Sequence, residues 1–258
     1  MIPFAHQPAP TAALLLGLVA AVPLSAQEAP ALDPDAMALL DEAAAALDAA
    51  PRLGFRWHVA YETVADGREK ITAFRDGATQ IARPDRVRIM HGEAGLRQEL
   101  RFDGATLSLI DSDRNLLATA PLDGTLETLA SAARERFGMD LPLQEFLTPD
   151  LASRLPEGLT GAALLGPTEW KGQPVWHLAF TQYEADWQLF LSRSTPPLPV
   201  LLVTTRTHEQ GWPQYRVEFS GWDFVRQVPA ALFAPPDDPD LRIVPMLTPS
   251  TADGGGAQ

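Results

Sequence analysis

The run from Gly166 to Thr205 is the sequence feature that most constrains the fold. Aromatic and aliphatic residues recur at every second position of this run, and turn residues divide it into consecutive segments. A period of two is typical of β-strands that bury one face, and strands joined by tight turns pair in antiparallel fashion. No catalytic motif lies within the run, so it says more about architecture than about chemistry. A binding function must therefore be argued from shape.

Alternating segments of the same kind lie on both sides of this run. Asp66-Gly67 and Asp103-Gly104 are two-residue hairpin signals, and Asp76-Gly77 predicts a further turn. Eleven segments carry strand signals, and we expect about ten strands from them: residues 55–61, 70–74, 86–90, 96–102, 105–110, 116–120, 162–168, 174–182, 186–192, 199–207 and 214–224. A sheet with this many strands curls, so the fold class is mainly β (α+β), with a curved antiparallel sheet.

Three segments carry helical signals instead. Asp33 and Pro34 are an N-cap and a first-turn proline, and an apolar stripe at helical spacing follows them. Residues 126–137 show the same spacing, and Gly138 stands where a helix C-cap belongs. Residues 141–155 predict short helical turns. Helices that pack on the concave face of a curved sheet could leave a cavity between the two layers.

Residues 1–26 predict a signal peptide. Residues 12–22 are uninterruptedly apolar, Pro23 ends the run, and Leu24-Ser25-Ala26 supplies the small residues of a cleavage site. The segment before the apolar run lacks Lys and Arg, and a membrane anchor is the alternative. Eleven or so apolar residues are few for a bilayer, which needs about 20. We therefore expect an exported protein that does not span the membrane after cleavage, with one domain over 27–247 and a disordered tail over 248–258.

Composition narrows the function classes. The 20 Lys and Arg residues against 33 Asp and Glu residues give a net charge of -13, which disfavours nucleic-acid binding. Cysteine is absent, so lipid attachment after the signal, disulfides and thiolate chemistry are excluded. We expect a soluble periplasmic protein whose core alone stabilises it.

Motifs for catalysis or metal binding are weak. A G-x-S-x-G motif is absent, and Phe219-Ser220-Gly221 is a fragment of one, so a hydrolase is a minor alternative. His58 and His177 lie at strand positions opposite the aromatic residues, which favours partly exposed strand histidines over a metal pair. The segment 111–115 begins like a calcium loop but lacks the later glycine and acid, which predicts a turn. We expect no enzyme activity, no metal and no cofactor.

Several segments along the chain resemble a family of predicted periplasmic proteins of uncharacterised function, itself similar in fold to the LolA, LolB and LppX types of lipoprotein carrier. The matching segments are Arg83-Pro84-Asp85-Arg86-Val87-Arg88, Phe102-Asp103-Gly104-Ala105-Thr106-Leu107, Phe137-Gly138-Met139-Asp140-Leu141-Pro142, His177-Leu178-Ala179-Phe180, Asp186-Trp187-Gln188-Leu189, Pro197-Leu198-Pro199 and Pro213-Gln214-Tyr215. The resemblance implies an unclosed half-barrel with helices on its concave face and an apolar cavity that could hold acyl chains.

The aromatic strand residues are the candidates for a ligand-binding site. With one leucine they comprise Trp57, Tyr61, Trp176, Phe180, Trp187, Leu189, Tyr215 and Phe219. They either fill a core under the helices or line an open pocket, and both interpretations stand at this point. We expect a periplasmic binding or carrier protein for a lipid or lipoprotein acyl chain. The alternative is a protein-interaction or sensor module that binds an envelope protein.

Overall fold

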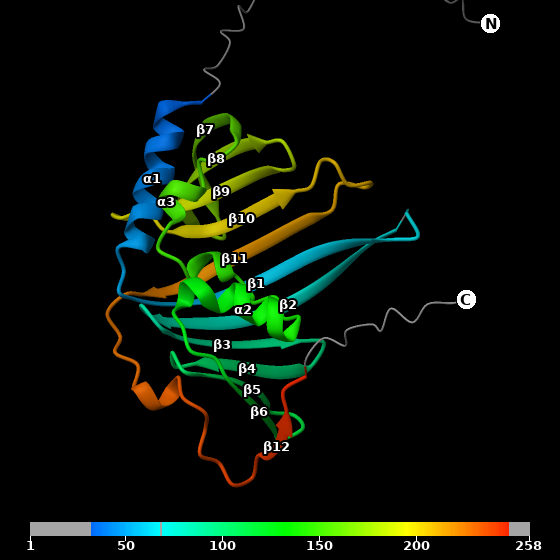
Figure 1. Ribbon diagram of the computed structural model, residues 1–258. Helices are drawn as coiled ribbons and strands as arrows, with labels where there is room; N and C mark the ends of the chain where they lie inside the picture. The colour runs from blue at the N-terminus through cyan, green and yellow to red at the C-terminus, as the bar shows by residue number, and fades with distance from the viewer. Residues whose placement is uncertain (1–31, 68, 248–258) are drawn as a thin grey trace, which may run out of the picture.

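A single twelve-stranded sheet dominates the structure (Figure 1). The computed structural model describes residues 32–67 and 69–247. The predicted signal peptide and the predicted tail lie outside these residues. The strands are β1 (Arg52–Ala65), β2 (Glu69–Ala82), β3 (Arg86–Glu93), β4 (Leu96–Phe102), β5 (Thr106–Asp111), β6 (Leu116–Pro121), β7 (Leu159–Trp170), β8 (Gln173–Gln182), β9 (Asp186–Ser192), β10 (Pro199–Thr205), β11 (Gln214–Asp223) and β12 (Arg242–Pro245).

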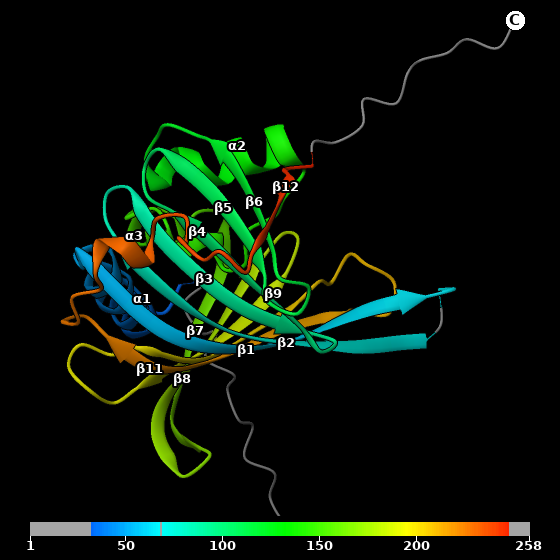
Figure 2. The same ribbon diagram turned by 90° about the horizontal axis from the view of Figure 1, so that it is seen from below.

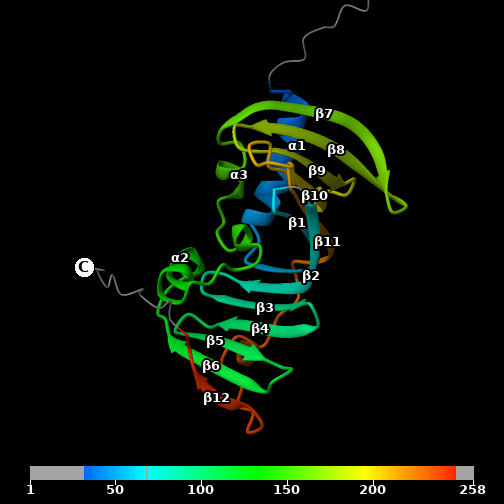
Figure 3. The same ribbon diagram turned by 90° about the vertical axis from the view of Figure 1, so that its right-hand side faces the viewer.

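The strand order is β12-β6-β5-β4-β3-β2-β1-β11-β10-β9-β8-β7. Two meanders, β1 to β6 and β7 to β11, join where β1 pairs with β11, and the short β12 adds to β6 in parallel. The sheet curves strongly, yet its edge strands β7 and β12 do not pair with each other (Figure 3). This confirms the predicted unclosed half-barrel. The hairpins at Asp66-Gly67 and Asp103-Gly104 are also confirmed.

The predicted turn at Asp76-Gly77 is wrong, because β2 runs through it. Gly77 lies directly opposite Trp57 of β1, and the indole ring covers it. A Cβ atom built at Gly77 would lie 2.1 Å from Cζ2 of Trp57. A glycine is therefore needed here to leave space for the indole ring. The sequence pattern Asp-Gly alone does not distinguish this role of a glycine from its role in a turn.

Helix α1 (Pro34–Asp48) begins as predicted and packs against the β7 end of the sheet. Oδ1 of Asp33 accepts a hydrogen bond from the N–H of Asp35, and Oδ2 accepts one from the N–H of Leu164 in β7. One side chain therefore caps the helix and ties it to the edge strand. The buried face of α1 consists of Ala36, Leu40, Ala43, Ala44 and Leu47.

The other helical elements lie on the same face (Figure 1). They are α2 (Leu126–Phe137), the 3₁₀ turn η1 (Gln144–Phe146) and α3 (Leu151–Arg154), which packs beside α1. Gly138 caps α2 in the left-handed conformation, with φ 66°, as predicted. Helices on the concave face of the sheet confirm the predicted layer arrangement.

The C-terminal segment crosses the opposite, convex face (Figure 2). It contains the 3₁₀ turn η2 (Ala230–Leu232) and the buried Phe233, and then reaches β12. Nη1 of Arg101 in β4 donates a hydrogen bond to the carbonyl oxygen of Ala234. The segment thereby covers the outer side of the β3–β6 region.

Candidate ligand-binding face

All eight predicted site residues lie on one face of the sheet. The register pairs Trp57 with Phe219 and Tyr61 with Tyr215 between β1 and β11. On the other side, Trp187 of β9 lies opposite Phe180 of β8. Residues opposite each other in a ladder point to the same side, and so do residues two apart along a strand. The shared face is the concave one that the helices cover, and we call it the concave face.

Phe180, Trp187 and Leu189 form a packed cluster with α1, here called the α1 cluster. Their exposed fractions are 2%, 8% and 6%. The rings of Phe180 and Trp187 stack with centroids 4.0 Å apart, and Nε1 of Trp187 donates to Oε1 of Gln182. Trp176 lies half-buried at the margin of the cluster, with the guanidinium of Arg193 4.7 Å from its ring centroid.

Trp57 and Phe219 belong to a second cluster below α2 and η1, here called the α2 cluster. Their exposed fractions are 3% and 7%. Phe219 packs edge-on against Phe146 of η1, with ring centroids 5.6 Å apart. Nε1 of Trp57 donates to Oγ1 of the buried Thr79. The apolar surfaces of both aromatic side chains are therefore packed against other protein atoms.

Tyr61 and Tyr215 remain partly exposed at the uncovered end of the concave face. The hydroxyl of Tyr61 donates to Oε1 of Glu93 at 2.5 Å, and Arg75 donates to Oε2 of the same carboxylate. The Tyr61 hydrogen bond, together with Arg75, lowers the pKa of Glu93, and the same bond raises the pKa of Tyr61. Burial, and secondarily the charge of Glu145, raises the pKa of Tyr215 to about 12.

Sequence reasoning did not identify Arg75 and Glu93 as part of this face. They lie opposite each other in β2 and β3, and Arg75 also lies opposite Val59. The incorrect turn at Asp76-Gly77 ended the expected strand just before Arg75. Continued alternation through that glycine is the signal that could have placed both residues on the concave face.

The two clusters meet at Leu155 and Leu202, each of which packs against both. Leu202 lies on β10, and Leu155 follows α3 at the end of residues 139–155, which we call the cover segment. Five buried side chains hold the cover segment on the sheet: Leu141, Leu143, Phe146, Leu147 and Leu151.

Two polar side chains fasten the cover segment at its edge. The carboxylate of Asp48 accepts hydrogen bonds from the N–H groups of Leu151 and Ala152, at 3.0 and 2.9 Å. Nη2 of Arg83 donates to the carbonyl oxygen of Phe146 at 3.0 Å, and its Nη1 donates to that of Ala50. The seam between the clusters is thus closed by one short segment with two identifiable polar attachments.

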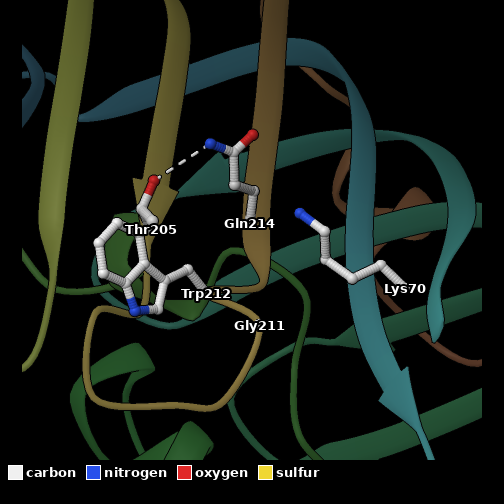
Figure 4. Close-up of a pocket in the computed structure, with 5 residues that line it drawn as sticks. All are labelled: Lys70, Thr205, Gly211, Trp212 and Gln214. Carbon is white, nitrogen blue, oxygen red and sulfur yellow. Dashed lines mark hydrogen bonds between the residues drawn. The ribbon is translucent and has the colours of Figure 1, made fainter. Parts of the chain in front are cut away.

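A hollow of about 410 Å³ lies apart from this seam, at the end of the sheet near the β10–β11 loop (Figure 4). Its lining residues are Lys70, Thr205, Gly211, Trp212 and Gln214. Nε2 of Gln214 donates to Oγ1 of Thr205 across it. By register Gln214 and Thr205 point away from the concave face, so this hollow is separate from the predicted site.

His58 and His177 do not form a metal pair. His58 is on β1 and His177 on β8, and three strands, β11, β10 and β9, separate them. His58 contacts Asp76, and His177 contacts Gln188. The described residues contain no group of three or more His, Asp or Glu side chains suited to a metal ion. The segment 111–115 is the predicted turn, in which Oδ1 of Asp111 accepts from the N–H groups of Asp113 and Arg114.

Solved structures with a similar arrangement have low sequence identity. The lipoprotein LppX of Mycobacterium tuberculosis is 12% identical over 76% of this chain and 99% of its own, with a TM-score of 0.45. LprF of Mycobacterium bovis is 10% identical over 78% and 98%, with a TM-score of 0.43. The MucA/MucB complex of Pseudomonas aeruginosa gives 20% identity over 81% of this chain and 63% of the matched chain, with a TM-score of 0.45.

Sequence comparison decides the family. A comparison with curated proteins finds no significant match. Within residues 32–67 and 69–247, no helix combines the length and the apolar character needed to cross a membrane. The family model described as predicted periplasmic protein DUF2092 matches residues 36–245, which confirms the periplasmic location expected from the sequence. The chain therefore belongs to the DUF2092 family of predicted periplasmic proteins.

Proposed function

We propose that this protein is a periplasmic carrier that binds an apolar cargo, the acyl chain of a lipid or lipoprotein, on the concave face. The observation that carries the proposal is the seam at Leu155 and Leu202. There, two apolar clusters of an unclosed sheet meet below a short cover segment. A chain that inserts between the clusters would exchange contacts with the cover segment for contacts with the ligand.

The energetics favour an apolar ligand of this kind. Each methylene removed from water contributes about 0.8 kcal/mol, so a chain of a dozen or more methylenes gains roughly 10 kcal/mol. This gain is of the same order as the loss of the five buried cover-segment side chains, at about 1.5–3 kcal/mol each. The sheet is open between β7 and β12, so its curvature can adjust without breaking a closed ladder. Tyr61 and Tyr215 at the uncovered end add partly exposed aromatic surface beside the seam.

The cover segment is the part of the fold best placed to admit the cargo. Its polar attachments are the two hydrogen bonds to Asp48 and the one from Arg83. Local opening needs the loss of these bonds and of the contacts of five buried apolar side chains, while the sheet stays intact. The cargo would then occupy the space that Phe146 and its neighbours fill in the closed state.

Native mass spectrometry of protein purified from the periplasm tests the proposal. We expect bound lipid in the wild type, and its loss in Leu202→Trp, which fills the seam. Leu165→Trp is the matched control, because Leu165 is 58% exposed on the edge strand β7. Near-UV circular dichroism verifies that both variants are folded. A folded wild type that carries no lipid and takes up no added fatty acid would overturn the proposal.

A protein-interaction module is the second candidate, and exposed aromatic residues at the open end favour it. Tyr183 and Trp212 are 79% and 62% exposed. Their loops are joined through His208, which contacts the carbonyl oxygen of Tyr183. In the loop of Trp212, Gln210 also donates to the carbonyl oxygen of Gly67 in the β1–β2 hairpin. An acidic protein of net charge -13 suits a basic partner. Affinity capture from envelope extracts with wild type and Trp212→Ala tests it, and capture that does not depend on Trp212 would contradict it.

A further inference from the structure

The β7–β8 hairpin curls around the sheet and places its tip on the convex face (Figure 3). Trp170 at this tip lies over Arg216 of β11, with the guanidinium 4.7 Å from the ring centroid. Next to it, Nζ of Lys171 and Nη2 of Arg216 both contact the carboxylate of Glu218. These contacts fasten the hairpin to β11 and create a wall that stands out from the sheet.

A hollow of about 490 Å³ lies between this wall and the strands β1, β2 and β11, and we call it the outer hollow. Its volume is within the range of about 300–1,000 Å³ typical of small-molecule sites. The residues that line it are Arg56, Trp57, His58, Asp76, Gly77, Trp170, Lys171, Gln173, Val200, Glu218, Phe219 and Ser220. It lies on the opposite side of the sheet from the proposed acyl-chain site.

The register explains why polar side chains gather here. His58 lies opposite Asp76 on one side and opposite Glu218 on the other, and Arg56 lies opposite Ser220. These positions alternate with Trp57 and Phe219, whose side chains point to the concave face. The strands therefore contribute polar side chains to the floor of the outer hollow, while the residues that alternate with them build the apolar core on the other face.

The groups of the outer hollow combine donors with acceptors and balance in charge. Among the lining residues, Arg56 and Lys171 carry two positive charges, and Asp76 and Glu218 carry two negative ones. Arg216 lies beside the lining and pairs with Glu218. Nδ1 of His58 contacts Oδ1 of Asp76 at 2.7 Å, which leaves Nε2 as a further polar group. Gln173 and Ser220 add a side-chain amide and a hydroxyl, which both donate and accept, to the lining.

This balance argues for a particular ligand class. A phosphate would be repelled by the two carboxylates, and a polyamine by the two cations. A sugar hydroxyl both donates and accepts, so a ring with several hydroxyls matches a lining that mixes donors and acceptors of both charge signs beside the indole of Trp170. We propose that the outer hollow binds a carbohydrate, independently of the acyl-chain site on the concave face.

Binding of defined carbohydrates to the folded, signal-free protein tests this proposal. Isothermal titration calorimetry with neutral and N-acetylated oligosaccharides represents soluble sugars, and co-sedimentation with purified peptidoglycan represents the cell-wall polymer. We expect binding in one of these arms. Ser220→Tyr fills the hollow from the exposed strand position and should abolish it, and Trp170→Ala should weaken it about tenfold.

A matched variant separates a local effect from misfolding. Ser131→Tyr changes an exposed serine on α2, outside the outer hollow, so this variant should bind like the wild type. Three results would overturn the proposal: no binding in either arm, binding that Ser220→Tyr leaves unchanged, or a stronger response to inorganic phosphate or spermidine than to every sugar. Since the lipid content of the protein is measured separately, a negative result here leaves the proposed carrier function untouched.

Discussion

The substitution Gly77→Ala should destabilise the fold strongly although it adds one methyl group. Gly77 is not at a positive φ, so the new residue meets no backbone strain. Its Cβ atom would instead lie 2.1, 2.4 and 2.6 Å from Cζ2, Cε2 and Cη2 of Trp57. Non-bonded carbon atoms prefer separations of about 3.5–4.0 Å, so the indole ring must move by roughly 1 Å or more.

The cost of this movement follows from what the indole contacts. Trp57 is 3% exposed, and its Nε1 donates to Oγ1 of Thr79, which is itself buried. Overpacking of a core costs about 1–3 kcal/mol, and a buried hydrogen bond left unmade adds about 1–3 kcal/mol. We expect a loss of about 3 kcal/mol, which for a domain of this size lowers Tm by about 6–12 °C.

Urea and thermal unfolding measure the effect, with Gly92→Ala as the control on the neighbouring strand. Gly92 lies opposite Asp76, and a Cβ atom built on it lies 3.7 Å from the carbonyl oxygen of Leu96, an ordinary van der Waals contact. We expect Gly92→Ala to be neutral or slightly stabilising, and Gly77→Ala to cost less in a Trp57→Phe background, which lacks the clashing atoms. Equal stability of the two alanine variants would refute this reasoning.

Three further predictions concern the attachments of the helices and the half-buried Tyr215. Asp48→Ala leaves two N–H groups of α3 unpaired, a loss of about 3 kcal/mol, so hydrogen exchange of the cover segment should accelerate roughly a hundredfold; Asp41→Ala, on the exposed face of α1, should not change it. Tyr215 should ionise near pH 12 in an ultraviolet titration, so the stability it contributes is present below pH 10 and is lost as the pH rises to about 12; a Tyr215→Phe protein with the same titration curve would contradict this. The pKa of Asp33 is lowered because its carboxylate accepts hydrogen bonds from N–H groups of β7 and α1. Asp33→Ala should therefore lower Tm at neutral pH, and this deficit should vanish in acid, where the wild-type carboxylate is protonated. A Tm deficit that does not depend on pH would contradict the role of Asp33 as a cap.

Much of the fold could be predicted because its strongest determinants are local. Alternation with a period of two placed Trp57, Phe180 and Trp187 on one face, since the face of a strand residue depends only on its position modulo two. Asp33 and Gly138 marked helix ends because their caps use hydrogen bonds and backbone angles within a few residues. The unclosed curvature followed from the number of strands and from family resemblance.

The parts that could not be predicted depend on contacts between distant segments. The pairing of β1 with β11 joins two meanders that are far apart in sequence. The need for a glycine at position 77 becomes clear only when the structure places the Trp57 ring over it. The attachment of the cover segment by Asp48 and Arg83 is equally non-local. The candidate site residues were brought to one face as expected, but whether they line a ligand site stays a prediction. Five of the eight are at most 8% exposed in the closed state.

Photo-cross-linking with a diazirine-labelled fatty acid tests the central claim most directly, because it reports where a bound chain lies. After irradiation of the folded protein, digestion and mass spectrometry map the labelled peptides. Our account predicts label on β10, around Leu202, and on the cover segment, around Leu155, with competition by unlabelled fatty acid. Label confined to the convex face, or an absence of specific label, would contradict a carrier that holds its cargo on the concave face.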